Sequence, residues 1–276
     1  MKIKYLGTAA AESVPALFCD CDVCKMAMKL GGRNLRTRSQ ALIDDTILID
    51  FPADTYYHFI QNKIKMSEIH TCIITHSHYD HLYAAEVETR RKSMSHLKND
   101  QPLHMYATYP AYHKIVDALI GARVDEEKRV IAHKIEEFVP FVAEGYKITP
   151  LRANHDAPTL PVFYSIEKEG KAILYANDTG IFPEETWNYL LNNPIKYDLV
   201  SLDCTSMLVP DINWHMGLPA NKMMRDRMFE NNLADENTRF ICNHFSHNSG
   251  LNHQDFVSIA ENEGFEVSFD GMEVEI

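Results

Sequence analysis

The chain has no apolar run long enough to cross a membrane. A transmembrane helix needs about 18 or more consecutive apolar residues, and the apolar runs of this chain are shorter than that. The first seven residues, Met1 to Gly7, contain two lysines and are too soon interrupted to form a signal peptide. We therefore expect no membrane partner and a cytoplasmic location, where thiols stay reduced.

The chain also has fewer basic than acidic residues. The chain carries 27 Lys and Arg residues against 39 Asp and Glu residues, which gives a formal net charge of −12. A protein that binds long nucleic acid usually has a basic patch or stripe, and the one local cluster here is Arg33, Arg36 and Arg38. The balance favours a small substrate. Guanidinium suits phosphate, so Arg36 and Arg38 are candidates for contact with a substrate phosphate, although charge runs more often form a solvated face.

Internal repeats, low-complexity tracts and long linkers are absent, so we expect the 276 residues, 45% of them hydrophobic, to form one domain, 1–276. Short apolar, β-branched runs are the expected strands: 2–6, 41–50, 70–75, 103–107, 146–151, 161–167, 171–176, 197–203, 238–243 and 265–270. Helix-like segments lie between several of them: 54–63, 109–121, 184–191, 219–231 and 253–263. This order predicts a layered α/β protein with sheet inside and helices outside. The polar segments 83–102 and 122–145 are expected to form a surface excursion that could be helical.

The strongest motif directly follows the apolar run 70–75. His76-x-His78-x-Asp80-His81 places three imidazoles and one carboxylate within six residues. Chance would produce this pattern in roughly two of a thousand chains of this composition. Histidines this close would repel one another if protonated and would lack partners if buried. A divalent ion such as zinc, manganese, iron or nickel removes both problems, whereas the alternative interpretation is a solvated polar turn.

The hexapeptide resembles the signature of the metallo-β-lactamase superfamily, whose fold is a four-layer αββα sandwich with two metal ions between the sheet edges. The resemblance implies that His76 and His78 hold the first ion, and that Asp80 and His81 hold the second. Three further ligands are implied just past later apolar runs: His155 for the first ion, Asp178 as a bridging carboxylate and His244 for the second ion. Oxygen-reducing di-iron members carry Glu where this chain has His78, so a redox role is disfavoured.

Three of the six cysteines form a separate cluster, Cys19-x-Cys21-x-x-Cys24. A structural zinc is normally closed by four ligands, and we choose His247, three residues past His244, as the fourth. Disulfides are disfavoured in the cytosol, which leaves an exposed loop of unpaired thiols as the alternative. Together with Leu6-Gly7-Thr8-Ala9 and Val14-Pro15, the cluster resembles the phosphoribosyl cyclic phosphate phosphodiesterases. A relative from pyrroloquinoline quinone biosynthesis shares a similar cluster.

The resemblance also implies a reaction. Two ions about 3.5–4 Å apart can bridge a hydroxide, lower its pKa and clamp the oxygens of an in-line displacement. His215 lies where phosphodiesterases of the superfamily carry a catalytic histidine, so it is the candidate general acid for the leaving oxygen. Packing or capping before a helix is its alternative role. Asp80 is expected to orient the nucleophile in addition to binding the second ion.

We therefore predict a binuclear metal-dependent phosphodiesterase that acts on a small cyclic or nucleotide-like phosphodiester. Its cofactors would be two catalytic divalent ions and one structural zinc. Two alternatives stay open: hydrolysis of a thioester or lactone by the same ligands, and a cofactor-biosynthesis or binding protein that has kept the metals. A homodimer is also left open by the sequence.

Overall fold

The computed structural model describes residues 1–276 and arranges their strands in two seven-stranded sheets. The first sheet contains β1 (Lys2–Gly7), β2 (Gln40–Ile43), β3 (Ile47–Ile49), β4 (Thr71–Ile73), β5 (Leu103–Ala107), β6 (Val130–Lys134) and β14 (Glu273–Glu275). The second contains β7 (Phe141–Ala143), β8 (Tyr146–Arg152), β9 (Val162–Lys168), β10 (Lys171–Ala176), β11 (Leu199–Asp203), β12 (Arg239–Asn243) and β13 (Glu266–Val267). Their orders are β14-β1-β2-β3-β4-β5-β6 and β13-β12-β11-β10-β9-β8-β7.

The two sheets pack face to face through apolar side chains. Because alternate residues of a strand point to opposite faces, each sheet buries one set of side chains against the other sheet. One core cluster joins Ile3 and Ile73 of the first sheet to Tyr164 and Ile173 of the second, and all four are fully buried. This shared core fixes the sandwich at the centre of the molecule.

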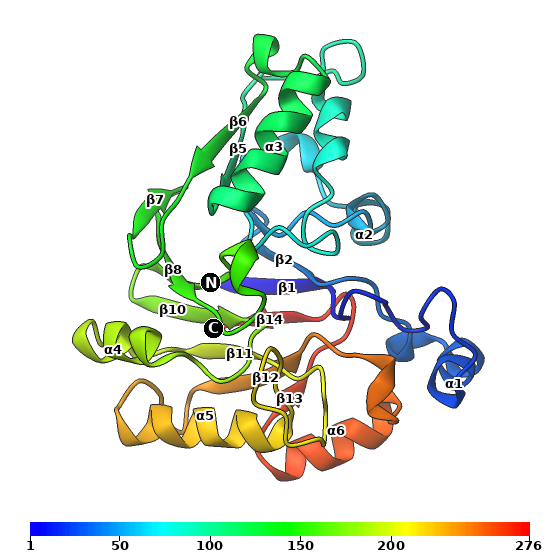
Figure 1. The fold of residues 1–276 in the computed structure, drawn as a ribbon, viewed down its shortest axis with the longest axis vertical. Coiled ribbons are helices and arrows are strands. Elements are labelled where there is room, and N and C mark those ends of the chain that lie inside the picture. Colours follow the sequence, from blue (N-terminus) through cyan, green and yellow to red (C-terminus); the bar gives the residue numbers. More distant parts are fainter.

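Helices cover both outer faces of the sandwich (Figure 1). Those on the first sheet are α2 (Thr55–Asn62) and α3 (Tyr109–Gly121), and those on the second are α4 (Glu184–Asn192), α5 (Leu218–Glu230) and α6 (His253–Asn262). Helix α1 (Asp22–Leu30) projects at one side in the same view. Short 3-10 turns are η1 (Gly32–Asn34), η2 (Met66–Glu68), η3 (Ala84–Arg90), η4 (Asp125–Glu127), η5 (Ala157–Thr159) and η6 (His247–Ser249). The predicted αββα sandwich is thus confirmed, and none of its helices is long and apolar enough to span a bilayer.

The strand directions determine where a site can form. Strands β3 to β6 run parallel to one another in the first sheet, and β10 to β13 do so in the second. The carboxyl ends of parallel strands meet at one edge of a sheet, and the loops that leave these ends are the usual place for ligands. Each sheet therefore offers one edge at which loops from several strands come together.

Four segments differ from the sequence-based expectation. The run 41–50 is a hairpin of β2 and β3 rather than one strand, because Asp44 and Asp45 adopt φ values of 46° and 54°, which suit a tight turn. The prediction that segment 122–145 could be helical is wrong, because this segment contains β6 and β7. Both are edge strands with partly exposed residues, so their apolar pattern is weak. Helix α1 and strand β14 lie outside the predicted helices and strands.

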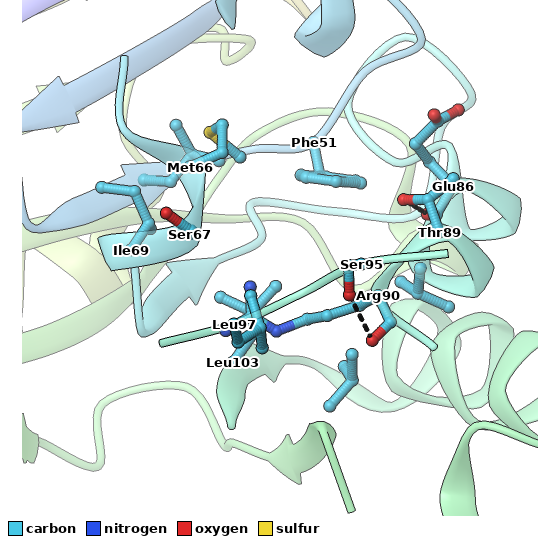
Figure 2. Close-up of a pocket in the computed structure, with 13 residues that line it drawn as sticks. Phe51, Met66, Ser67, Ile69, Glu86, Thr89, Arg90, Ser95, Leu97 and Leu103 are labelled. Atoms are coloured by element: carbon cyan, nitrogen blue, oxygen red, sulfur yellow. Dashed lines mark hydrogen bonds between the residues drawn. The ribbon is translucent and has the colours of Figure 1, made fainter. Parts of the chain in front are cut away.

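The segment 83–102 folds back over the outer face of the first sheet. It begins with η3, and the Ser95 hydroxyl donates a hydrogen bond of 2.9 Å to the carbonyl of Arg90. Between this segment and the sheet lies a cavity of about 200 Å³, lined mainly by apolar residues that include Phe51, Met66 and Leu103 (Figure 2). None of the predicted metal ligands lines it.

Candidate active site and zinc site

The predicted catalytic ligands come from four strand ends and meet at one place. The His76–His81 loop leaves β4, His155 follows β8, Asp178 follows β10 and His244 follows β12. At the base of the loop, Thr75 donates to Asp50 from its backbone nitrogen (2.8 Å) and its hydroxyl (2.9 Å). These bonds fix the direction in which the chain leaves the strand. The segments are far apart in sequence, and only the packing of the two sheets brings them together.

The first group of ligand atoms surrounds a single point. The Nε2 atoms of His76 and His155 lie 2.9 Å and 3.2 Å from Nδ1 of His78. Nε2 of His76 also lies 3.3 Å from Oδ2 of Asp178. The four side chains each offer one ligand atom, and these atoms lie within 4.8 Å of one another. This is the set that the sequence predicted for the first ion, with the bridging carboxylate included.

The second group shares Asp178 with the first. Its other members are Asp80, His81 and His244, and all four residues are buried. Nε2 of His81 lies 3.0 Å from Oδ2 of Asp178 and 3.3 Å from Oδ2 of Asp80. Nε2 of His244 lies 3.8 Å from the same Asp178 oxygen. A carboxylate that belongs to both groups has the position expected of a bridging ligand.

The chemistry of these atoms fits a pair of divalent cations. Nε2 of His81, Nε2 of His244 and Oδ1 of Asp178 are buried and make no hydrogen bond within the protein, although burying such atoms without a partner is costly. Burial and the neighbouring histidines lower the pKa of His76 well below its usual value, which keeps the neutral imidazole that a metal requires. His81 and His244, with Asp80 and Asp178, would hold one ion, and His76, His78 and His155, with Asp178, the other.

In three of the ligand histidines, the ring nitrogen that faces away from the metal position makes a hydrogen bond within the protein. Nδ1 of His81 donates to Asp50 Oδ2 at 2.7 Å, and Nδ1 of His155 donates to the carbonyl of Trp214 at 3.2 Å. Nδ1 of His244 lies 2.8 Å from Thr205 Oγ1 and 3.3 Å from Asp203 Oδ2. Such bonds fix the tautomer and direct the other nitrogen toward a metal. Asp50 and Asp203 are not among the residues predicted from the sequence, although each stands at the end of a buried strand, which is the available signal.

His215 lies beside both carboxylates at the centre of the site. Its Nδ1 is 3.2 Å from Asp203 Oδ2 and 3.2 Å from Asp178 Oδ1. Burial of the ring lowers its pKa, but the Asp203 carboxylate outweighs this effect, and the pKa of His215 is raised to about 9. The side chain remains 27% exposed. The arrangement therefore supplies a protonated imidazole that solvent and ligands can reach.

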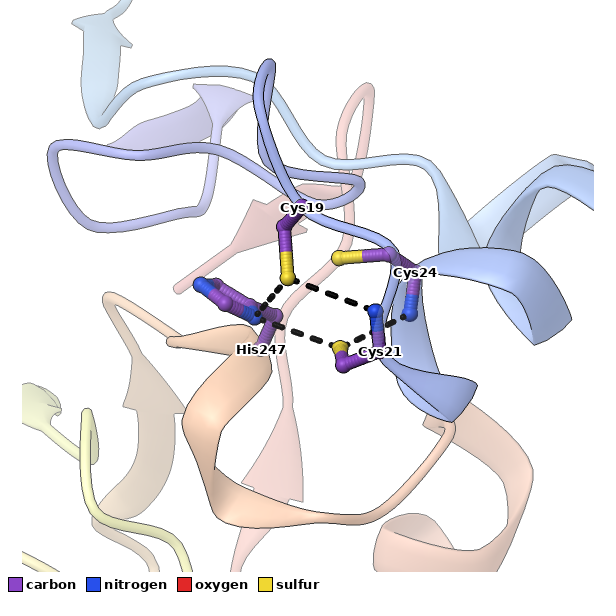
Figure 3. Close-up of side chains that lie close together, drawn as sticks. All are labelled: Cys19, Cys21, Cys24 and His247. Carbon is purple, nitrogen blue, oxygen red and sulfur yellow. Dashed lines mark hydrogen bonds between the residues drawn. The ribbon is translucent and has the colours of Figure 1, made fainter.

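The three clustered cysteines and His247 also come together (Figure 3). Nδ1 of His247 lies 3.6 Å from Sγ of Cys19 and 3.5 Å from Sγ of Cys21. Tetrahedral zinc with bonds of about 2.3 Å to sulfur and 2.0–2.1 Å to nitrogen requires a separation of about 3.6 Å. Hydrogen bonds from the Cys24 backbone and from His247 lower the pKa of Cys21 to about 6, which favours the thiolate that binds metal. The four residues thus fit a closed zinc site.

The two arginines proposed for phosphate contact have different surroundings. Arg36 is buried, donates to Thr8 Oγ1 and the Ser268 carbonyl at 2.7 Å each, and stacks over the ring of Phe245. Arg38 pairs with Asp54 at 3.2 Å, and its guanidinium lies 5.8 Å from the ring of Tyr79, within the metal-binding loop. Phosphate contact therefore stays a prediction for both arginines.

The comparisons with known proteins identify the family of the chain. A family model described as the beta-lactamase superfamily domain matches residues 46–225, which is more than half of the chain. The chain therefore belongs to the β-lactamase superfamily, and it is a hydrolase with the metallo-β-lactamase fold. No curated protein matches the chain by sequence.

Several solved structures share the fold over nearly their whole length. One is described as a new diphosphatase from the PhnP family: it is 20% identical, with a TM-score of 0.73, covering 100% of this chain and 98% of that chain. Zinc-bound PqqB from Methylobacterium extorquens is 18% identical, with a TM-score of 0.72 and full coverage of both chains. The short form of human tRNase Z is 15% identical, with a TM-score of 0.67, covering 100% of this chain and 99% of that chain. At these identities the likeness concerns the fold alone.

Proposed function

We propose that this chain is a phosphodiesterase that acts on a small cyclic or nucleotide-like phosphodiester with two divalent ions. The observation that carries the proposal is the shared carboxylate: Asp178 belongs to both ligand groups and also lies 3.2 Å from Nδ1 of His215. Ligands for a pair of ions and a proton donor would therefore meet around one point. When bound, such ions activate water and offset the negative charge of a phosphate undergoing in-line displacement.

The residues of the chain supply the remaining requirements. Asp203 holds His215 through Nδ1, which directs Nε2 away from the carboxylate and keeps the ring protonated near neutral pH. Nε2 would donate its proton to the leaving oxygen, as an alkoxide needs in order to depart. Asp80 is fixed beside His81 at 3.3 Å and would orient the attacking water in addition to binding an ion.

The similar structures and the charge of the chain are consistent with this substrate class. One of these structures is named a diphosphatase, and another, a tRNase, is named for a much larger phosphodiester. The net charge of −12 makes a long polyanion an unsuitable partner, whereas a small phosphodiester can be held by the ions. We further propose zinc or manganese for the catalytic pair, a cytoplasmic location, and one zinc at Cys19, Cys21, Cys24 and His247.

The test compares substrates and leaving groups. Purified protein loaded with zinc or manganese should hydrolyse bis(p-nitrophenyl) phosphate faster than a thioester or a lactone. His215→Ala should lose about 10²–10⁴-fold in kcat on a phosphodiester with an alkoxide leaving group, and far less when p-nitrophenolate leaves without help. The exposed His96 serves as a matched control, because His96→Ala should leave both rates unchanged.

Other outcomes would assign other functions. Preferred hydrolysis of the thioester or lactone would make the chain a carboxyl-ester-type hydrolase with the same ligands. Metal binding without turnover of any of these substrates would indicate a cofactor-biosynthesis or binding protein. Equal losses in His215→Ala on both phosphodiesters would remove His215 from the role of general acid.

A further inference from the structure

The two tryptophans of the chain have opposite environments. Trp187 is fully buried, whereas 54% of Trp214 is exposed to solvent. Large aromatic side chains contribute most to stability when they are buried. The exposed indole of Trp214 therefore calls for an explanation other than core packing.

Trp214 lies against the first group of metal ligands. Its ring centroid is 5.5 Å from that of His155, at an interplanar angle of 67°. Its carbonyl accepts the hydrogen bond from His155 Nδ1, and the next residue is His215. The backbone of Trp214 is thus hydrogen-bonded to a predicted metal ligand, His155, and covalently continues into the predicted proton donor, His215. The indole therefore lies beside the site.

The loop that carries Trp214 is held in place. Ile181 N donates to the carbonyl of Ile212 at 3.0 Å. A Cβ atom on Gly180 would lie 2.4 Å from that carbonyl and 2.9 Å from Trp214 N, so the loop packs closely on the segment after Asp178. Trp214 itself has φ of 62°, a left-handed conformation that is rare for a bulky residue and is kept where the surroundings impose it. The ring is therefore presented from a fixed backbone.

The loop that carries the indole also exposes several apolar side chains. Leu208, Val209 and Ile212, on the same loop, are 42%, 55% and 39% exposed. An uncharged aromatic face offers no charge to a phosphate, which the metals would hold, but it can stack on a planar ring. Every nucleobase offers such a ring, and stacking of this kind depends little on which base is present.

We propose that Trp214 is the stacking platform for a planar ring of the substrate. The substrate class is then a phosphodiester that carries a nucleobase, or an equivalent aromatic ring, close to the reacting phosphorus. This inference rests on the proposed phosphodiesterase function and narrows it, because it disfavours phosphodiesters that carry only a sugar.

The test compares two ligands that differ by one ring. Adenosine 5′-monophosphate and ribose 5-phosphate share the sugar and the phosphate, and only the first has a base. In the metal-loaded wild-type protein, the nucleotide should quench the fluorescence of Trp214 and bind about tenfold or more tightly than the sugar phosphate. The buried Trp187 contributes a constant background to this signal. Calorimetry should show the same preference in Trp214→Phe, and its loss in Trp214→Ala.

Each other outcome overturns the inference. Equal affinities in the wild type, no binding of either ligand, or a preference that persists in Trp214→Ala would show that the indole does not receive the ring. Turnover of bis(p-nitrophenyl) phosphate tests the proposed function separately. Turnover without a nucleotide preference would refute the stacking role of Trp214 and support the phosphodiesterase activity. A nucleotide preference without turnover of any phosphodiester would support the stacking role of Trp214 and refute the phosphodiesterase activity.

Discussion

Replacing Asp203 with asparagine changes one oxygen at the centre of the site and preserves the shape of the side chain. Asp203 is fully buried at the end of β11. Its Oδ1 accepts hydrogen bonds from the backbone nitrogens of Met216 (2.8 Å) and Thr205 (3.0 Å). Its Oδ2 faces Nδ1 of His215 at 3.2 Å and Nδ1 of His244 at 3.3 Å. In Asp203→Asn the backbone bonds would keep the amide oxygen at Oδ1, so the NH₂ group would replace Oδ2.

This exchange places a donor opposite two imidazole donors. His244 then loses the carboxylate that favours a proton on Nδ1 and keeps only Thr205 Oγ1, 2.8 Å away, as an acceptor there. An amide hydrogen that faces Nδ1 favours the ring protonated at Nε2, the nitrogen aimed at Asp178. A protonated Nε2 cannot bind a metal, and loss of such a supporting bond typically weakens metal binding about 10–100-fold. His215 loses the carboxylate that raises its pKa, so turnover on a poor leaving group should fall by about 10²–10⁴-fold.

The two effects can be separated by a metal titration. Activity measured against metal concentration gives the apparent affinity of the weaker ion, and the plateau gives kcat at saturation. Excess metal should restore the part of the loss that acts through His244, and it should not restore the part that acts through His215. Asp198→Asn is the matched control, because Asp198 precedes the same strand at its far end and pairs with Lys171. Unchanged metal affinity and plateau in Asp203→Asn would refute the reasoning.

Three further perturbations test other parts of the molecule. Asp178→Ala should release both catalytic ions while one zinc remains, because this carboxylate belongs to both ligand groups; elemental analysis that finds one catalytic ion retained would argue against a bridging role. Cys21→Ser should show the reverse, with loss of one zinc and a lower Tm but residual activity while folded; wild-type zinc content and Tm would contradict the zinc site. Burial lowers the pKa of His58 from 6.5 to about 4, so between these pH values the unfolded chain takes up a proton that the folded chain does not. The free energy of unfolding should therefore decrease by up to about 3 kcal/mol as the pH falls from 6.5 to 4, and His58→Gln, measured by denaturant titration, should show a smaller decrease; identical pH profiles would exclude this contribution.

The residues that could be predicted from the sequence share one local property. His155, Asp178 and His244 each follow an apolar run, and the family order of such residues is preserved in this chain. A buried strand is recognisable in the sequence, and the residue at its carboxyl end lies at the sheet edge whatever the neighbouring strand is. The strand pattern made each of these residues a candidate, and the resemblance to the family, with its order of ligands, selected them from the other residues that end strands.

The groups that support the ligands could not be found in this way. Asp50 contacts His81, and Asp203 contacts His244, and each pair lies more than thirty residues apart. An acidic residue at a strand end has no distinctive pattern until the imidazole it meets has been placed. The burial of Arg36 could not be predicted either. Its place in a charge run favours a solvated group, whereas the fold buries it against Phe245.

The backbone at the site shows how the fold directs these side chains. Asp50, Asp178 and His244 follow β3, β10 and β12, and they have φ values of 67°, 54° and 64°. A left-handed conformation costs a residue other than glycine roughly 1–2 kcal/mol. Glycine would relieve that cost at each position but would remove the carboxylate or imidazole.

The left-handed residue ends each strand abruptly, so that its side chain stays at the sheet edge instead of being carried away with the loop. The interlocked sheets, with fully buried residues such as Tyr164 and Ile173 between them, hold the strands rigidly enough to impose this conformation. The local strain and the convergence of ligands thus have one cause, which is that chains leaving a rigid edge must turn sharply to place several polar groups around the same point.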